Sequence, residues 1–147
     1  MGKVRLTVFA ALVAAGVLAA VAVASAKTLT ISLRPTAVGK VLVAAHGRTL
    51  YLFTADKGKR STCYGQCAGY WPPLLASKPS VGTGLKSSML GTTKRKDGKL
   101  QVTYGGHPLY YFVQDKKAGQ VKGQGFVHFG GSWWVVSAAG ARITSKP

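Results

Sequence analysis

A seven-residue stretch occurs twice in this chain, 59 positions apart, and it limits the choice of fold more than any other feature. Residues 50–56 read LYLFTAD and residues 109–115 read LYYFVQD, so that a Leu-Tyr pair, a Phe and a final Asp hold the same places in both. The chain has only three acidic residues, and two of them, Asp56 and Asp115, are equivalent in the two copies. The pattern therefore indicates an internal repeat.

The first 26 residues have the pattern of a secretory leader. Lys3 and Arg5 form a charged start, residues 6–23 are an almost unbroken apolar run, and residues 24–26 (ASA) fit a small-residue cleavage site. Cleavage there would leave a secreted, periplasmic or envelope protein without an integral membrane span. Because the apolar run is long for a leader, an uncleaved N-terminal anchor is the alternative.

The chain is strongly basic, with 20 Lys and Arg residues, three acidic ones and a net charge of +17. Without Lys3 and Arg5, the remaining 18 basic residues and three acidic ones give the mature chain +15. Such a charge attracts polyanions without specifying one, for example wall polymers, anionic headgroups or acidic polysaccharides. Recognition of a specific nucleic acid is not expected. The alternative is a solvated surface suited to acidic or salty surroundings.

After the leader, the apolar residues recur at the period of strands. Residues 28–33 alternate between polar and apolar, and Pro35 is expected to end this first strand. Residues 40–45 and 49–54 flank His46-Gly47 as in a hairpin. No helical period of useful length follows the leader, so the sequence predicts an all-β domain.

The second half has turn dipeptides between further apolar runs. Asp97-Gly98, Gly105-Gly106 and Gly130-Gly131 are each followed by a strand-like segment. Neither half could bury a core alone, so the halves should pack about a pseudo-twofold axis as a small antiparallel sandwich or barrel of hairpins. We expect one β domain over residues 27–147, with repeats at about 28–76 and 89–140 and a linker at 77–88.

The motif stretch is typical of a strand that is covered on both sides. Tyr51 and Phe53 would share one face, the neighbouring leucines would share the other, and both faces are apolar, as in a central strand. Tyr110 and Phe112 should play the same part in the second copy.

Tryptophans extend the correspondence between the two halves. Trp71 of the first half corresponds to Trp133 or Trp134 of the second if the loop slips by a few residues. Adjacent strand residues face opposite ways, so we expect either Trp133 or Trp134 to be exposed, and an exposed tryptophan beside a basic loop would suit polymer binding.

Cys63 and Cys67 are the only cysteines of the chain. In an exported protein a disulfide is expected between them, and with so short a loop it would stabilise by only about 2 kcal/mol. The alternative is a redox-active or metal-binding pair, although the spacing differs from the common redox and haem motifs.

Beyond the two motif copies, several segments resemble one known family. They are Cys63 through Trp71-Pro72-Pro73-Leu74, Gln101-Val102-Thr103-Tyr104, Gly123-Gln124-Gly125 and Trp133. The chain is similar to the secreted repeat proteins often called lipoproteins with a Yx(FWY)xxD motif, a bacterial envelope family. The resemblance implies export but no established activity. Many relatives are lipid-anchored, whereas this chain has no cysteine at the predicted processing site, so we do not carry that anchor over.

Asp56 and Asp115 are the candidates for acid–base catalysis or cation binding if the twofold axis brings them together. The structural alternative, which we favour, is that each accepts hydrogen bonds from the backbone of its own turn. His46, His107 and His128 lack the spacing of a metal site and should lie in turns or on the surface. We therefore predict no catalytic residue, no metal and no cofactor.

Basic residues follow the first motif copy and surround one hairpin turn of the second half. We expect them to bind anionic envelope polymers, and they are Lys57, Lys59, Arg60, Lys94, Arg95, Lys96 and Lys99. The leading hypothesis is a non-enzymatic exported β-module. The alternative is an envelope redox or electron-transfer accessory that uses Cys63 and Cys67 or a bound cofactor.

Overall fold

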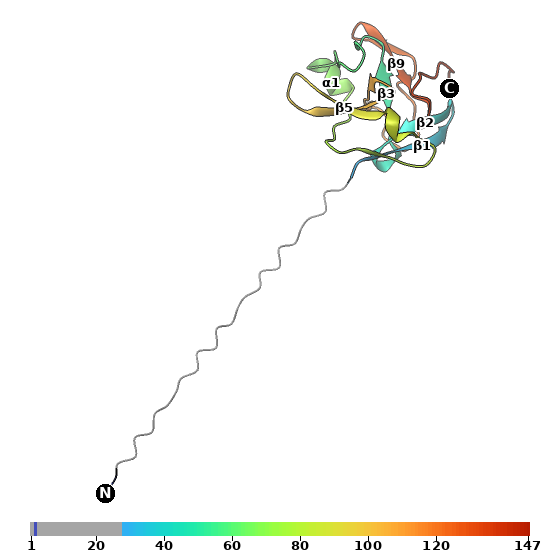
Figure 1. Cartoon of the computed structure of the whole chain (residues 1–147). Helices are drawn as coiled ribbons and strands as arrows, with labels where there is room; N and C mark the ends of the chain where they lie inside the picture. Colours follow the sequence, from blue (N-terminus) through green and yellow to red (C-terminus); the bar gives the residue numbers. More distant parts are fainter. Residues whose placement is uncertain (1, 3–27) are drawn as a thin grey trace.

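The structure is a computed structural model that describes Gly2 and residues 28–147 (Figure 1). Apart from Gly2, the predicted leader lies outside the described residues. The strands are β1 (Thr30–Thr36), β2 (Gly39–Val43), β3 (Tyr51–Phe53), β4 (Ser80–Val81), β5 (Leu90–Lys94), β6 (Leu100–Tyr104), β7 (His107–Pro108), β8 (Phe126–His128) and β9 (Gly131–Val135). They form three small sheets, with the orders β2-β1-β4, β3-β9-β8 and β5-β6-β7.

The prediction of a β domain is confirmed in its coarse form, with two corrections. The three sheets do not close into a barrel. One short helix, α1 (Gln66–Tyr70), and two single 3-10 turns, η1 (Ala45–Gly47) and η2 (Ser87–Met89), occur where only loops and turns were expected. Helix α1 has five residues and buries only Cys67, so it is too short to leave a helical period in the sequence. It ends at Tyr70, because the next residue, Trp71, precedes Pro72, and a residue before proline disfavours helical backbone angles.

The expectation that Pro35 ends the first strand is wrong, since β1 continues to Thr36 and Pro35 pairs with Lys40 of β2. The other side of β1 pairs with β4 only at Thr30 and Ile31, so Pro35 has no ladder partner there to lose. Strand β4 lies inside the predicted linker at 77–88, which is therefore partly built into a sheet. It pairs with β1 in parallel, so the prediction of a wholly antiparallel arrangement is wrong at this strand.

Strand β3 separates two parts of the core. Tyr51 and Phe53 belong to a cluster with the cysteines and most of the aromatic rings, whereas Leu50 and Leu52 belong to a second cluster of mainly aliphatic residues. All four are at most 4% exposed. The prediction that both faces of β3 are buried is therefore confirmed.

The two motif copies meet at a pair of backbone hydrogen bonds. The Tyr51 N–H donates to the Tyr110 carbonyl at 2.9 Å, and the Tyr110 N–H donates to the Tyr51 carbonyl at 3.0 Å. This reciprocal pairing relates equivalent residues, so it marks the pseudo-twofold axis. The strand expected at 108–113 is otherwise irregular, because β7 stops at Pro108.

Four aromatic rings form one stacked column through the first core cluster. The ring centroids of Phe53 and Trp133 lie 4.0 Å apart, those of Trp133 and Trp71 lie 4.0 Å apart, and those of Trp71 and Phe112 lie 4.2 Å apart. The order Phe, Trp, Trp, Phe reads the same from either end, so Trp71 corresponds to Trp133 and not to Trp134. Trp133 is fully buried and Trp134 is half-buried, so the expectation that one of them is exposed is wrong. The indole N–H of Trp134 donates to Ser132 Oγ.

We expect Gly123→Ala to lower the free energy of unfolding by about 1–3 kcal/mol, because it overpacks this column. A Cβ at Gly123 would lie 2.6 Å from Cη2 of Trp71 and 3.1 Å from a ring carbon of Phe112. Gly69→Ala is the matched control, since a Cβ there meets nothing within 4 Å and alanine favours helix α1. Urea unfolding of both variants checks this, and equal stability of the two would contradict it.

Candidate functional site

The motif tyrosines and aspartates are paired across the two repeats. The Tyr51 hydroxyl donates to Oδ2 of Asp115 at 2.6 Å, and the Tyr110 hydroxyl donates to Oδ2 of Asp56 at 2.8 Å. Each copy therefore supplies a tyrosine to the aspartate of the other copy. The sequence contained one signal of this arrangement, the equal spacing from Tyr to Asp in both copies, but the spacing does not say which copy binds which.

The remaining carboxylate oxygens bind the backbone of their own turns. Oδ1 of Asp56 accepts the Thr62 N–H at 2.8 Å, and Oδ1 of Asp115 accepts the Lys122 N–H at 2.9 Å. Burial raises the pKa of both carboxyls, and these hydrogen bonds together with those from the tyrosines oppose the rise. Each aspartate therefore has its own tyrosine and its own turn as partners, and the expected hydrogen bonds from the backbone of each turn are present.

Arg95 does not lie at an exposed hairpin tip as predicted, because it is only 5% exposed. Its Nη1 donates to Ser61 Oγ at 3.0 Å and to Gln101 Oε1 at 2.7 Å, and its Nη2 donates to the Cys63 carbonyl at 2.8 Å. The guanidinium also lies over the ring of Tyr64, 4.3 Å from its centroid. Arg95 is therefore occupied within the domain and is removed from the candidate polymer-binding residues.

Buried Arg95 joins the two segments that carry the other candidate residues. It links the β5–β6 hairpin to the loop after β3, and the Lys96 N–H adds a hydrogen bond of 3.0 Å to the Tyr64 hydroxyl. Figure 1 shows this hairpin beside α1, at the end of the same loop. Six exposed basic residues therefore gather around one loop, and we call them the basic cluster: Lys57, Lys59, Arg60, Lys94, Lys96 and Lys99.

We expect Arg95→Met to cost about 2–3 kcal/mol of unfolding free energy, because the acceptors on Gln101 and Cys63 then lose a charged donor. Lys96→Met is the matched control. It removes the same charge from an exposed neighbour and should change stability by no more than about 0.5 kcal/mol. Thermal unfolding of both variants measures this, and an unchanged Arg95 variant would show that the buried contacts contribute nothing.

The predicted disulfide between Cys63 and Cys67 is confirmed, with Cα atoms 5.2 Å apart. It closes the turn that leads into α1 and holds Cys63 where its carbonyl accepts from Arg95. The cysteines are 0% and 6% exposed. An attacking thiolate would therefore have poor access to the bridge.

The histidines lie apart in the chain and in the fold. His46 occupies the turn between β2 and β3 with a left-handed φ of 59°, His107 begins β7, and His128 ends β8. Among residues 28–147, the structure brings together no group of three or more His, Cys, Asp or Glu side chains that could hold a metal ion.

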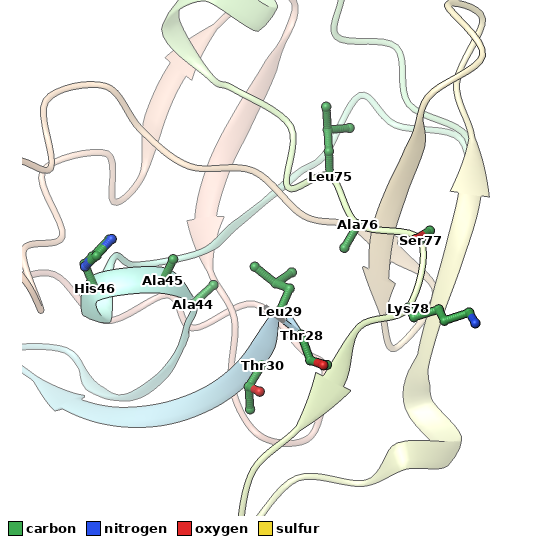
Figure 2. A pocket seen from close by; sticks show the side chains of 10 residues that line it. All are labelled: Thr28, Leu29, Thr30, Ala44, Ala45, His46, Leu75, Ala76, Ser77 and Lys78. Carbon is green, nitrogen blue, oxygen red and sulfur yellow. The ribbon is translucent and has the colours of Figure 1, made fainter. Parts of the chain in front are cut away.

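A hollow of about 740 Å³ lies between β1, the β2–β3 turn and the segment before β4 (Figure 2). Leu29 and Leu75 supply apolar surface, and Figure 2 shows His46 and Lys78 at its two ends. None of its lining residues carries a carboxylate or a thiol. No pattern in the sequence predicted this hollow, because three separate segments form it.

Both halves of this domain match one known family. Residues 33–75 and 91–137 each match the family Lipoprotein_15, described as a secreted repeat of unknown function. The chain belongs to this family. Each matched segment contains one copy of the Tyr-x-Phe-x-x-Asp motif, so the repeat and the family resemblance are both confirmed. Comparisons with curated proteins and with solved structures give no match.

Membership in Lipoprotein_15 also confirms the predicted secreted or envelope location. Within the part of the chain that the structure describes, no helix is long and apolar enough to cross a membrane. In this chain the tyrosine of each Lipoprotein_15 motif copy binds the aspartate of the other copy, and these two hydrogen bonds help to hold the repeats together. The basic cluster, rather than the motif, is then the candidate for function.

Proposed function

We propose that this exported domain binds anionic polymers of the cell envelope through the basic cluster and catalyses no reaction. The observation that supports it most is the buried Arg95, which holds two separate basic segments around one loop. Six positive charges on two segments that are joined in this way bind a polyanion more strongly than the same charges spread over the whole surface.

Positive charges outnumber negative ones around the basic cluster. Asp97 is the one carboxylate in this hairpin turn, and the backbone N–H of Lys99 lowers its pKa, with a further contribution from Arg95, so Asp97 stays ionised and offsets one of the six positive charges. Asp56 is already bound to Tyr110 and Thr62. A lysine near an anionic surface contributes about 1 kcal/mol, so the cluster as a whole could hold a polyanion at moderate salt.

Retention of the exported protein on isolated cell walls and on anionic vesicles, measured across a salt series, tests this proposal. The variant replaces four lysines of the cluster by glutamine, namely Lys57, Lys59, Lys94 and Lys96. The matched control replaces four exposed lysines elsewhere, namely Lys40, Lys78, Lys116 and Lys117. Both lose the same charge, so a binding site at the cluster predicts a much larger loss for the first variant.

The dependence of retention on salt concentration distinguishes electrostatic binding at the basic cluster from binding through apolar contacts. Retention should weaken steeply between about 0.1 M and 1 M salt, because the screening length falls from about 10 Å to 3 Å. Retention that ignores salt, or that falls equally in both variants, would refute a specific basic cluster. The redox alternative gains no support from the geometry, since both cysteines are buried.

A further inference from the structure

The β8–β9 hairpin and helix α1 form a second surface of unusual composition. All three residues of β8 are exposed, and β8 is the outer strand of its sheet. Of the five exposed large hydrophobic residues in the described part of the chain, three lie here. We call this surface the aromatic tip, and it consists of Tyr70, Phe126, Val127, His128 and Phe129.

Contacts between rings hold the aromatic tip together. The Tyr70 ring centroid lies 5.7 Å from that of His128 and 6.0 Å from that of Phe129. Phe126 also approaches Phe112 at 5.8 Å, so part of its side chain serves the core. Val127 has no such role in the core, because its side chain is 78% exposed. An apolar group so exposed, next to exposed aromatic rings, marks an interaction surface.

The arrangement fits insertion into an apolar medium better than contact with a flat partner. Successive strand residues point to opposite faces, so Val127 points away from Phe126 and His128. Each face of the hairpin therefore carries at least one exposed apolar side chain. A sugar ring would stack on an aromatic face and would gain little from an aliphatic side chain, whereas the interface of a lipid bilayer surrounds both faces.

The charges beside the aromatic tip complement an anionic bilayer. Gly131 in this hairpin packs against the segment that leads to Lys57, since a Cβ on it would lie 2.9 Å from the Ala55 nitrogen. The Ser132 N–H donates to Thr54 Oγ1 at 2.8 Å in the same region. The basic cluster therefore begins next to the tip. A second copy of the chain is a poor occupant, because both copies would carry the same large positive charge.

We propose that the aromatic tip inserts into the headgroup region of anionic lipid bilayers while the basic cluster binds the headgroups. This inference rests on the proposed function and narrows its target to a lipid surface. Apolar insertion and electrostatic attraction contribute together to binding of this kind, and neither alone gives stable attachment.

Flotation of the exported protein with vesicles of phosphatidylcholine, with and without phosphatidylglycerol, tests the inference. We expect Tyr70→Ser/Val127→Ser to lower partitioning onto the anionic vesicles at least tenfold, since two apolar side chains no longer leave water. Leu75→Ser is the control, because Leu75 is 40% exposed, against 42% for Tyr70, and belongs to neither the aromatic tip nor the basic hairpin, so this variant should bind normally. Thermal unfolding of both variants, and the single variant Val127→Ser, separates binding from folding.

The outcomes separate this inference from the proposed function. If the wild type binds anionic vesicles and the tip variant binds equally well, the inference is wrong and the proposed function stands. The same holds if the wild type binds cell walls in a salt-sensitive way but ignores vesicles. If it binds neither, both are wrong. Concentration-dependent dimers that disappear in the tip variant would identify a second copy as the occupant and would also overturn the inference.

Discussion

Replacing Trp133 by alanine is expected to lower the free energy of unfolding by about 3–5 kcal/mol, the usual cost of removing a fully buried tryptophan. Trp133 stacks between Phe53 and Trp71 at centroid distances of 4.0 Å on both sides, and it meets Tyr110 edge-on at 5.1 Å. Its loss therefore breaks contacts with both repeats at once. Denaturant unfolding gives the value directly.

Trp134→Ala provides a matched control for this result. The two tryptophans are neighbours in β9, but Trp134 is half-buried and packs on the other core cluster. Its replacement should cost clearly less, about half as much or below. If both variants lost the same stability, the aromatic column would not be the centre of the fold.

The local features of the fold were predictable from the sequence. The alternation of polar and apolar residues and the turn dipeptide His46-Gly47 are properties of short segments. The predicted turn forms there, with a backbone hydrogen bond from Ala44 to Arg48, but β2 and β3 continue into different sheets, so the predicted hairpin is limited to one bridge between Val43 and Thr49. The repeat itself predicted a pseudo-twofold relation between Tyr51 and Tyr110. The alternation and the turn depend on neighbours in the chain, and the repeat is found by comparing two segments of it, so the sequence records all three.

The features that join distant segments were not predictable. Arginine is usually a surface residue. The burial of Arg95 depends on acceptors at Ser61, Cys63 and Gln101 that only the folded chain brings together. The choice between Trp133 and its neighbour likewise depended on which face of β9 meets the core. The sequence identified the two basic segments but could not show that Arg95 and Lys96 join them.

Raising the pH above 10 is expected to unfold this domain steeply because of Tyr51 and Tyr110. Burial raises the pKa of both hydroxyls well above the ordinary value of 10.0, and the negative charge of the paired aspartate raises it further. In the unfolded chain the same hydroxyls ionise near pH 10. The folded state therefore keeps protons that the unfolded state has lost, and the stability that is complete below pH 10 decreases as the pH rises.

The slope of the unfolding free energy against pH follows from the number of protons that the folded state keeps and the unfolded state loses. Each tyrosine that stays protonated only in the folded state lowers the unfolding free energy by about 1.4 kcal/mol per pH unit, so two of them remove about 5 kcal/mol between pH 10 and pH 12. Urea unfolding at intervals of half a pH unit, followed by tyrosinate absorbance, measures this slope.

Tyr51→Phe and Tyr110→Phe identify the groups responsible. Each variant should begin less stable by about 1–3 kcal/mol, because one aspartate oxygen loses its hydrogen bond. Above pH 10, however, each should lose stability more slowly than the wild type, and the double variant should lose the least. Since the two hydroxyls are equivalent under the pseudo-twofold axis, the two single variants should have similar slopes. A wild-type slope that persists in the double variant would show that other groups cause the alkaline unfolding and that the crossed pairs do not hold the two repeats together in solution.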